Sequence, residues 1–87
     1  MTAIVIHPRD NVAVALKDLQ KGETLALADG RTISLLSDIP FSHKVALADI
    51  ASGQEIVKYG ENIGEAKEEI RRGQWVHTHN LTIDEKG

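Results

Sequence analysis

Residues 14–25 read VALKDLQKGETL and residues 45–56 read VALADIASGQEI, so the two stretches align without a gap. Residues 66–76, AKEEIRRGQWV, repeat the same unit more weakly. The shared unit is an acidic residue, an aliphatic residue, two variable residues and a glycine, with another aliphatic residue three positions later. This repeat dominates the prediction of the fold, because it sets the same turn at three places in a short chain.

Each position of the unit has a physical role. The first aliphatic residue is expected to fill the core beneath a one-turn helix, and the glycine can take the positive φ that ends such a turn. The acidic residue stands where a carboxylate can accept hydrogen bonds from the free N–H groups at the start of the turn. The members are Asp18, Leu19 and Gly22; Asp49, Ile50 and Gly53; and Glu69, Ile70 and Gly73.

Short runs of strand character lie between these turns. The pair Asp29-Gly30 predicts a two-residue hairpin loop with Ala28 and Arg31 beside it, and Tyr59–Asn62 predicts a second tight turn. The predicted strands are Thr2–His7, Val12–Leu16, Leu25–Ala28, Thr32–Ser37, Lys44–Leu47, Glu55–Tyr59, Asn62–Ile63 and Trp75–His79.

Two segments also have helical character. Val12–Leu19 has apolar residues at helical spacing, but we favour a strand because the equivalent stretch of the second repeat follows Pro40 too closely for a helix. Only Gly64–Arg72 has the length and charge pairing of a helix. The pattern therefore predicts an all-β fold with short helical turns, a compact twisted small barrel or clip, as one domain over residues 1–81 with a tail at 82–87.

Composition limits the classes of partner. Eighty-seven residues suffice for one core only, and a formal charge of −3 from ten basic and thirteen acidic residues gives no footprint for nucleic acid. The absence of cysteine fits a cytoplasmic protein, and the longest apolar run, Val12–Leu16, is too short to cross a membrane. With one Trp, one Tyr and one Phe, the core must be aliphatic and its stability marginal, which favours a partner chain or self-association.

The strongest candidate for chemistry is His77-Thr78-His79. Residues two apart on a strand point to one face, so both imidazoles would project together with Trp75. Two such rings can chelate a divalent metal or bind an anionic oxygen, although they fall short of a complete metal site. The alternative is a polar strand end without function.

The pair His43-Lys44 follows a turn at Pro40 and would suit a carboxylate or a hydroxyl-rich acid, or else form part of a solvated loop. His7 before Pro8 is expected to be structural, as are the turn or cap residues Asp10 and Asn11.

Four blocks together resemble the SAF domain of the altronate/galactarate dehydratase family. They are IHPRDNVAVAL at residues 6–16, IPFSHKVAL at 39–47, IVKYG at 56–60 with Ile63-Gly64, and GQWVHTHNL at 73–81. Several blocks in the same order are more specific than one short motif. The resemblance implies a SAF-type β-clip, in the separate small-subunit form known from sulfolactate sulfo-lyase.

That resemblance also implies a function. It indicates the small subunit of a metal-dependent hydro-lyase that acts on a sugar acid such as altronate or galactarate, or of a related sulfo-lyase, together with a large catalytic subunit and iron(II) or manganese. The site residues that it implies are His43 and Lys44 for catalysis, His77 and His79 for the metal, and Ser42 and Asn80 for the substrate. Ser42 departs from the family pattern, which often has glycine there.

Two other readings stay open at this level. The chain could be a non-catalytic module that binds a small hydroxy acid or carbohydrate, since SAF domains also occur in sialic acid synthases and antifreeze-type proteins. It could also be a structural assembly domain with ordinary surface histidines.

Overall fold

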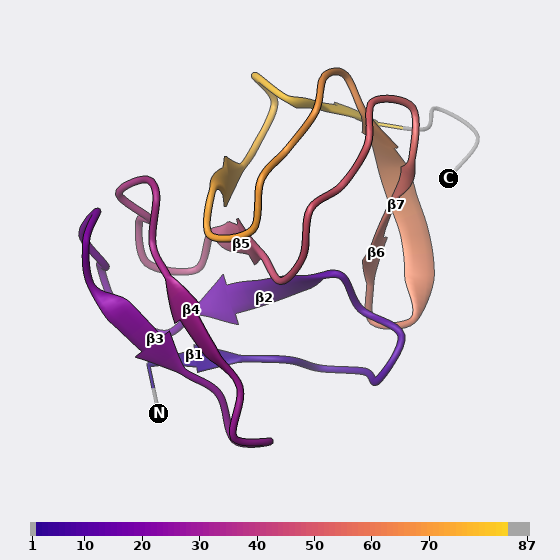
Figure 1. Ribbon diagram of the computed structural model, residues 1–87. Coiled ribbons are helices and arrows are strands. Elements are labelled where there is room, and N and C mark those ends of the chain that lie inside the picture. The colour runs from indigo at the N-terminus through magenta and orange to yellow at the C-terminus, as the bar shows by residue number, and fades with distance from the viewer. Residues whose placement is uncertain (1, 84–87) are drawn as a thin grey trace.

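The computed structural model describes residues 2–83, and within them the chain forms nine strands and no helix (Figure 1). This confirms the prediction of an all-β fold. The strands are β1 Ala3–Ile4, β2 Val12–Ala15, β3 Thr24–Ala26, β4 Thr32–Ser34, β5 Lys44–Ala46, β6 Glu55–Lys58, β7 Glu61–Ala66, β8 Trp75–Val76 and β9 Leu81–Ile83.

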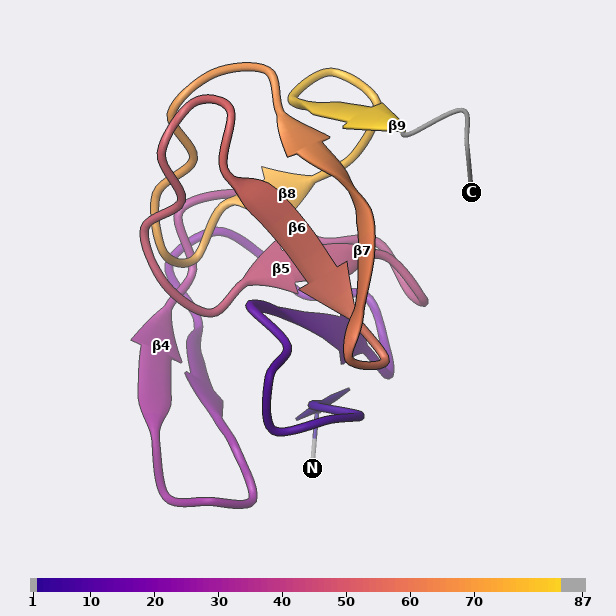
Figure 2. The ribbon, with the colours of Figure 1, turned by 90° about the vertical axis from the view of Figure 1, so that its right-hand side faces the viewer.

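The strands form three antiparallel sheets. A four-stranded sheet in the order β1-β2-β5-β8 lies in the middle, with the β3–β4 hairpin to one side and the three strands β6-β7-β9 to the other (Figures 1 and 2). These sheets stay separate and do not close on one another. The predicted barrel is therefore wrong, whereas a small clip built of hairpins fits the structure.

The middle sheet divides the interior into two hydrophobic cores. Neighbouring residues of a strand point to opposite faces, so Ala13 and Val45 enter one core while Val12 and Ala46 enter the other. The first core lies toward the β3–β4 hairpin and the second toward β6, β7 and β9. Because both faces of β2 and β5 are largely buried, these strands carry only Val and Ala apart from the partly buried Lys44 at the start of β5.

The repeat units form pairs of turns that lock each core. Leu19 and Ile39 exchange two backbone hydrogen bonds of 2.8 Å, and Ile50 and Ile70 do the same at 2.7 and 2.8 Å. All four side chains are buried. The turn that contains Ile39 is a fourth copy, Asp38–Ser42, which the sequence pattern does not display because serine stands where the others have glycine.

These turns are tight β-turns, not the one-turn helices that the sequence predicts. In each, an N–H donates to the carbonyl three residues earlier, and the third residue has a positive φ, as a type II turn requires. These third residues are Gly22 at 93°, Ser42 at 69°, Gly53 at 83° and Gly73 at 93°. The backbone before each turn pairs with its partner turn, which leaves no N–H groups for a helix.

The acidic residues connect the turns of a pair. Asp18 accepts a hydrogen bond from the Phe41 amide, and Asp38 accepts one from the Lys21 amide, both at 2.8 Å. In the other pair, Asp49 accepts from the Arg72 amide at 2.9 Å. The expectation that these carboxylates serve their own turn is wrong for Asp18 and Asp49, because each reaches across to the opposite turn.

The two predicted hairpins are present. Leu27 and Arg31 flank a three-residue loop in which only Gly30 has a positive φ, so the loop at Asp29 is one residue longer than predicted. Tyr59 and Gly60 both have positive φ, as a two-residue type I′ turn between β6 and β7 requires.

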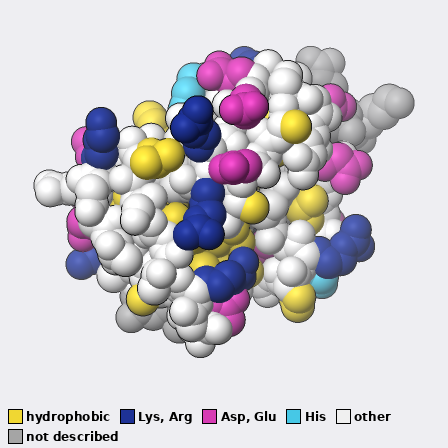
Figure 3. Space-filling view, in the orientation of Figure 1, with side chains coloured by type: hydrophobic (Ala, Val, Ile, Leu, Met, Phe, Trp, Pro, Cys, Tyr) yellow, Lys and Arg dark blue, Asp and Glu magenta, His cyan; other side chains and the backbone are white. Residues whose placement is uncertain are grey.

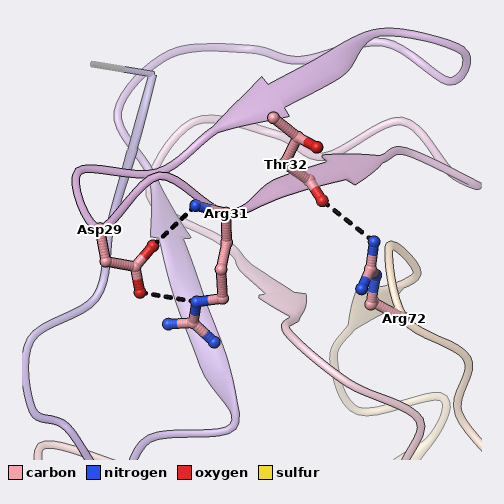
Figure 4. Close-up of polar contacts among 4 residues, drawn as sticks. All are labelled: Asp29, Arg31, Thr32 and Arg72. Carbon is pink, nitrogen blue, oxygen red and sulfur yellow. Dashed lines mark hydrogen bonds and ion pairs between the residues drawn. The ribbon is translucent and has the colours of Figure 1, made fainter.

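Two arginines contact the first hairpin, one within its loop and one from the last turn of the repeat (Figure 4). Arg31 binds Asp29 through its Nε at 2.6 Å and its amide at 3.0 Å, and this amide is the main reason why the pKa of Asp29 is lowered. Arg72, from the last turn of the repeat, donates to the Thr32 carbonyl at 3.0 Å. The hairpin is thus anchored to the segment that leads into β8.

Two boundaries differ from the prediction. The expected helix at Gly64–Arg72 is absent from the described residues, since its first three residues belong to β7 and Ile70 pairs with Ile50. Thr82 and Ile83 of the predicted tail belong to β9, and residues 84–87 lie outside the described part of the chain. Over residues 2–83, no helix has the length and apolar character needed to cross a membrane.

Candidate functional site

Strand pairing brings the two predicted histidine segments together. His43 stands directly before β5, and Trp75 opens β8, which pairs with β5 in the register Val45↔Trp75 and Lys44↔Val76. The site therefore forms at the edge of the middle sheet, where the turn at Ser42 lies on one side and the end of β8 on the other.

Trp75 is the centre of an aromatic cluster of four rings. Its ring stacks on His77 with centroids 5.3 Å apart and planes at 6°, and lies 5.2 Å from His79. His43 lies 5.6 Å from Trp75 and 4.8 Å from His77. In addition, the Trp75 indole Nε1–H donates to His43 Nδ1 at 3.2 Å. All three predicted imidazoles thus contact one indole.

His77 and His79, which follow β8, are held by a turn and not by a continuous strand. β8 ends at Val76, and a turn over residues 77–80 follows, in which the Asn80 amide donates to the His77 carbonyl at 3.0 Å. The buried Asn80 side chain accepts from the His77 amide and donates to the Trp75 carbonyl, both at 2.9 Å. The expected side-by-side projection from one strand is wrong, and Asn80 is what fixes the loop.

His43 is available to the site because of the residues around it. In the other three turns, the residue after the glycine turns its side chain back to accept from the first amide of the turn: Glu23 from Gln20, Gln54 from Ala51 and Gln74 from Arg71. In the turn at Ser42 the first residue is Pro40, which has no N–H. The side chain at the equivalent position, His43, is free to turn toward Trp75.

Two side chains at the candidate site, Lys44 and His77, have lowered pKa values. Burial lowers the pKa of Lys44, and the nearby Lys58 charge lowers it further. The pKa of His77 is lowered first by loss of water contact and then by His43, Lys44 and His79. The lowered pKa favours the neutral form of His77, in which one ring nitrogen has a lone pair that can accept a proton or a hydrogen bond.

Comparison with known proteins gives the family. The model of the altronate/galactarate dehydratase SAF domain matches residues 1–84. The chain belongs to this family.

Its relatives are of two kinds. It is similar to altronate dehydratase of Escherichia coli (strain K12), with 48% identity over 80 residues that cover 92% of this chain and 16% of that protein. Galactarate dehydratase (L-threo-forming) of the same organism is 39% identical over 82 residues, covering 94% and 15%. This SAF domain thus spans about a sixth of these relatives. The (2R)-sulfolactate sulfo-lyase subunit alpha of Chromohalobacter salexigens is 31% identical over 84 residues, covering 88% of this chain and 89% of that subunit.

The SAF domain does not itself provide a complete metal site. Over residues 2–83, no three His, Asp or Glu side chains gather where they could hold a metal ion. His77 and His79 each contact Trp75, and no ring contact joins them to each other. The predicted metal-binding role of this pair stays a prediction, and it would need ligands from elsewhere.

The remaining predicted residues have clear positions. Ser42 and Lys44 flank His43 on the loop and strand that carry it, and their roles toward a substrate stay predictions. His7 accepts from the Arg9 amide through Nδ1 at 3.1 Å and packs over Gly60, while Asp10 caps the His7 and Gly60 amides at 3.1 and 2.8 Å. Asn11 bonds the Glu55 carbonyl and the Val57 amide at 2.8 and 2.7 Å, so the structural roles expected here are confirmed.

An apolar groove that sequence reasoning did not predict lies elsewhere on the surface. It has a volume of about 560 Å³ and contains none of the predicted site residues. On the face shown in Figure 3, acidic and basic side chains are intermixed. The groove is lined by Ala3, Ile4, Val5, Ile6, His7, Pro8, Leu27, Ala28, Asp29 and Arg31.

Proposed function

We propose that this chain acts in a carbon–oxygen hydro-lyase for a sugar acid such as altronate or galactarate, or in a related sulfo-lyase, as the SAF part that works with a large catalytic chain. The single observation that carries the proposal is the cluster of three imidazoles around Trp75. The names of the relatives support the same class of reaction, because they are dehydratases and a sulfo-lyase subunit.

The chemistry of the cluster suits such a substrate. Elimination of water next to a carboxylate needs a group that takes the α-proton and groups that orient the carboxylate and the leaving hydroxyl. The lowered pKa of His77 favours the neutral imidazole, whose free lone pair can accept the α-proton, and the Lys44 ammonium adds positive charge for an acid. Ser42 and His79, both exposed at the rim, are suited to contact hydroxyl groups.

The open form of the site supports a partner chain. The four rings lie at a sheet edge and outside the apolar groove, so the remaining walls of a substrate pocket must come from elsewhere. A divalent metal, iron(II) or manganese, would polarise the substrate carboxylate when bound. Since the residues at 2–83 do not form a complete metal site, we propose that the large chain holds most of its ligands.

The test is to purify the tagged chain from its own cells, identify the co-purifying protein by mass, and assay the mixture with altronate, galactarate and sulfolactate. We expect turnover only with both chains present. His77→Ala should lower kcat by about 10²-fold or more, the scale of a lost proton-transfer group. His7→Ala is the matched control, because His7 lies at the turn before β2 and outside the cluster.

Either of two results would contradict the proposal. One is a chain that remains alone and turns over none of the three acids, which would favour a non-catalytic module for a hydroxy acid. The other is full turnover by the two-chain mixture that carries His77→Ala.

A further inference from the structure

In three of the four turns, the side chain that follows the third residue accepts a hydrogen bond from the first amide of the turn. In the turn at Ser42, the first residue is Pro40, which has no amide hydrogen, so His43 makes no such bond. The His43 ring has one recorded polar partner among residues 2–83, the Trp75 indole. Its Nδ1 lies 3.2 Å from the indole Nε1. The contact is therefore specific to this turn and is not a general feature of the repeat.

The chemistry of the two groups fixes where the proton on His43 resides. Indole Nε1–H is a donor only, so the nitrogen that faces it must offer a lone pair. In a neutral imidazole one nitrogen accepts and the other carries the hydrogen. With Nδ1 accepting, the hydrogen of neutral His43 is on Nε2, at the opposite side of the ring.

We propose that Trp75 is a positioning residue that holds His43 in the Nε2–H tautomer, so that His43 presents a hydrogen-bond donor to an oxygen of the bound acid. This inference rests on the proposed function, and it names the contact that one residue of that site makes. The ligand group is an acceptor, a carboxylate or hydroxyl oxygen. His43 therefore orients the substrate and does not take its proton.

The rest of the cluster supports this role for Trp75. Its ring lies flat on His77 and near His79, so the indole cannot turn without breaking these contacts. The backbone on both sides of the ring is held too, since the Trp75 carbonyl accepts from the Asn80 side chain at 2.9 Å and Val45 pairs with Trp75. The donor is thus held in place before any ligand binds.

The first test uses Trp75→Phe, which keeps an aromatic ring at this position but is smaller and has no N–H donor. In the full chain with ¹⁵N-labelled histidine, long-range nitrogen–proton spectra should show a single Nε2–H tautomer for His43 in the natural protein and a mixture of both in Trp75→Phe. His7 is an internal control, because its Nδ1 accepts from the Arg9 amide at 3.1 Å and its tautomer should not change.

The reciprocal variant keeps the inference testable if Trp75→Phe fails to fold. In His43→Ala, the Trp75 indole proton should move upfield and exchange faster with water. An unchanged indole proton in His43→Ala, or an Nδ1–H tautomer of His43 in the natural protein, would overturn the inference.

Turnover separates this inference from the proposed function. With the partner chain, Trp75→Phe should raise KM for the acid by about tenfold, the equivalent of one hydrogen bond of about 1.4 kcal/mol, with a smaller change in kcat. A kcat loss as large as that of His77→Ala with unchanged KM would contradict the positioning role. The expected tautomer together with no turnover of any acid would count against the proposed function alone.

Discussion

Three of the four turns are built for stability, and the fourth is built differently. The turns at Gly22, Gly53 and Gly73 each have glycine at the positive φ and a Glu or Gln that caps the turn. The turn at Ser42 has proline in place of the capped amide, serine in place of glycine and histidine in place of the capping residue. Candidate site residues thus lie in the one turn that lacks the glycine and the capping hydrogen bond of the others, a pattern expected of functional sites.

The largest expected effect is at a glycine of the stabilising kind. A Cβ at Gly73 would lie 2.2 Å from the Ser34 carbonyl oxygen, whereas a Cβ at Gly22 would have nothing within 4 Å. Both have φ of 93°. Gly73→Ala should therefore lower the free energy of unfolding by about 3 kcal/mol or more, and Gly22→Ala by about 1–2 kcal/mol. Urea unfolding followed by circular dichroism measures both, and equal losses would refute the assigned clash.

A middle-sized effect is expected where a carboxylate joins two turns. Asp18→Ala removes the bond to the Phe41 amide and should cost about 1 kcal/mol in the free energy of unfolding. Glu69 stands at the equivalent position of the last turn, but no hydrogen bond of its side chain is found within residues 2–83. Glu69→Ala should therefore change stability by less than about 0.5 kcal/mol. The same urea series tests the difference, and a larger loss at Glu69 would contradict it.

The smallest effect concerns the exceptional turn itself. Ser42 has φ of 69°, a conformation that costs an L residue about 1–2 kcal/mol and glycine very little. Glycine also gains about 0.4–1 kcal/mol of conformational entropy when unfolded. Ser42→Gly should therefore stabilise the chain by only about 0.5 kcal/mol in the same unfolding series. Destabilisation by Ser42→Gly would mean that the serine side chain makes a contact of its own.

The sequence predicted the parts of the fold that depend on residue type alone. The glycine turns, the two hairpins and the all-β class follow from conformational preferences that local sequence expresses. Pairing between turns, such as Leu19 with Ile39, could not be predicted, because a hydrogen bond between distant backbones leaves no mark on residue identity. The helix predicted at Gly64–Arg72 failed for the same reason, since tertiary pairing of β7 overrides helical propensity.

For the candidate site, sequence reasoning names the histidines but does not predict how they are arranged around Trp75. His43, His77 and His79 were named from their spacing and from the family resemblance, but Trp75 was expected only to share a face with the last two. That it would bind His43 depends on the β5–β8 register, which the sequence does not display. Pro40 was a usable signal, since a proline at the capped position of a repeat releases the side chain three residues later.

The position of β5 has a consequence for how the chain acquires its structure. β5 pairs with β2 on one side and β8 on the other, and the second core combines Val12 with Leu81. These contacts join residues that are far apart in the sequence. Bringing such residues together costs chain entropy before the stabilising contacts can form, and this slows folding. The second core cannot assemble on a ribosome until β8 and β9 have emerged, and the first core shares strands β2 and β5 with it. Although its sequence is repetitive, the domain is expected to fold in one late cooperative step, unlike solenoid proteins, in which each repeat can add to the one before.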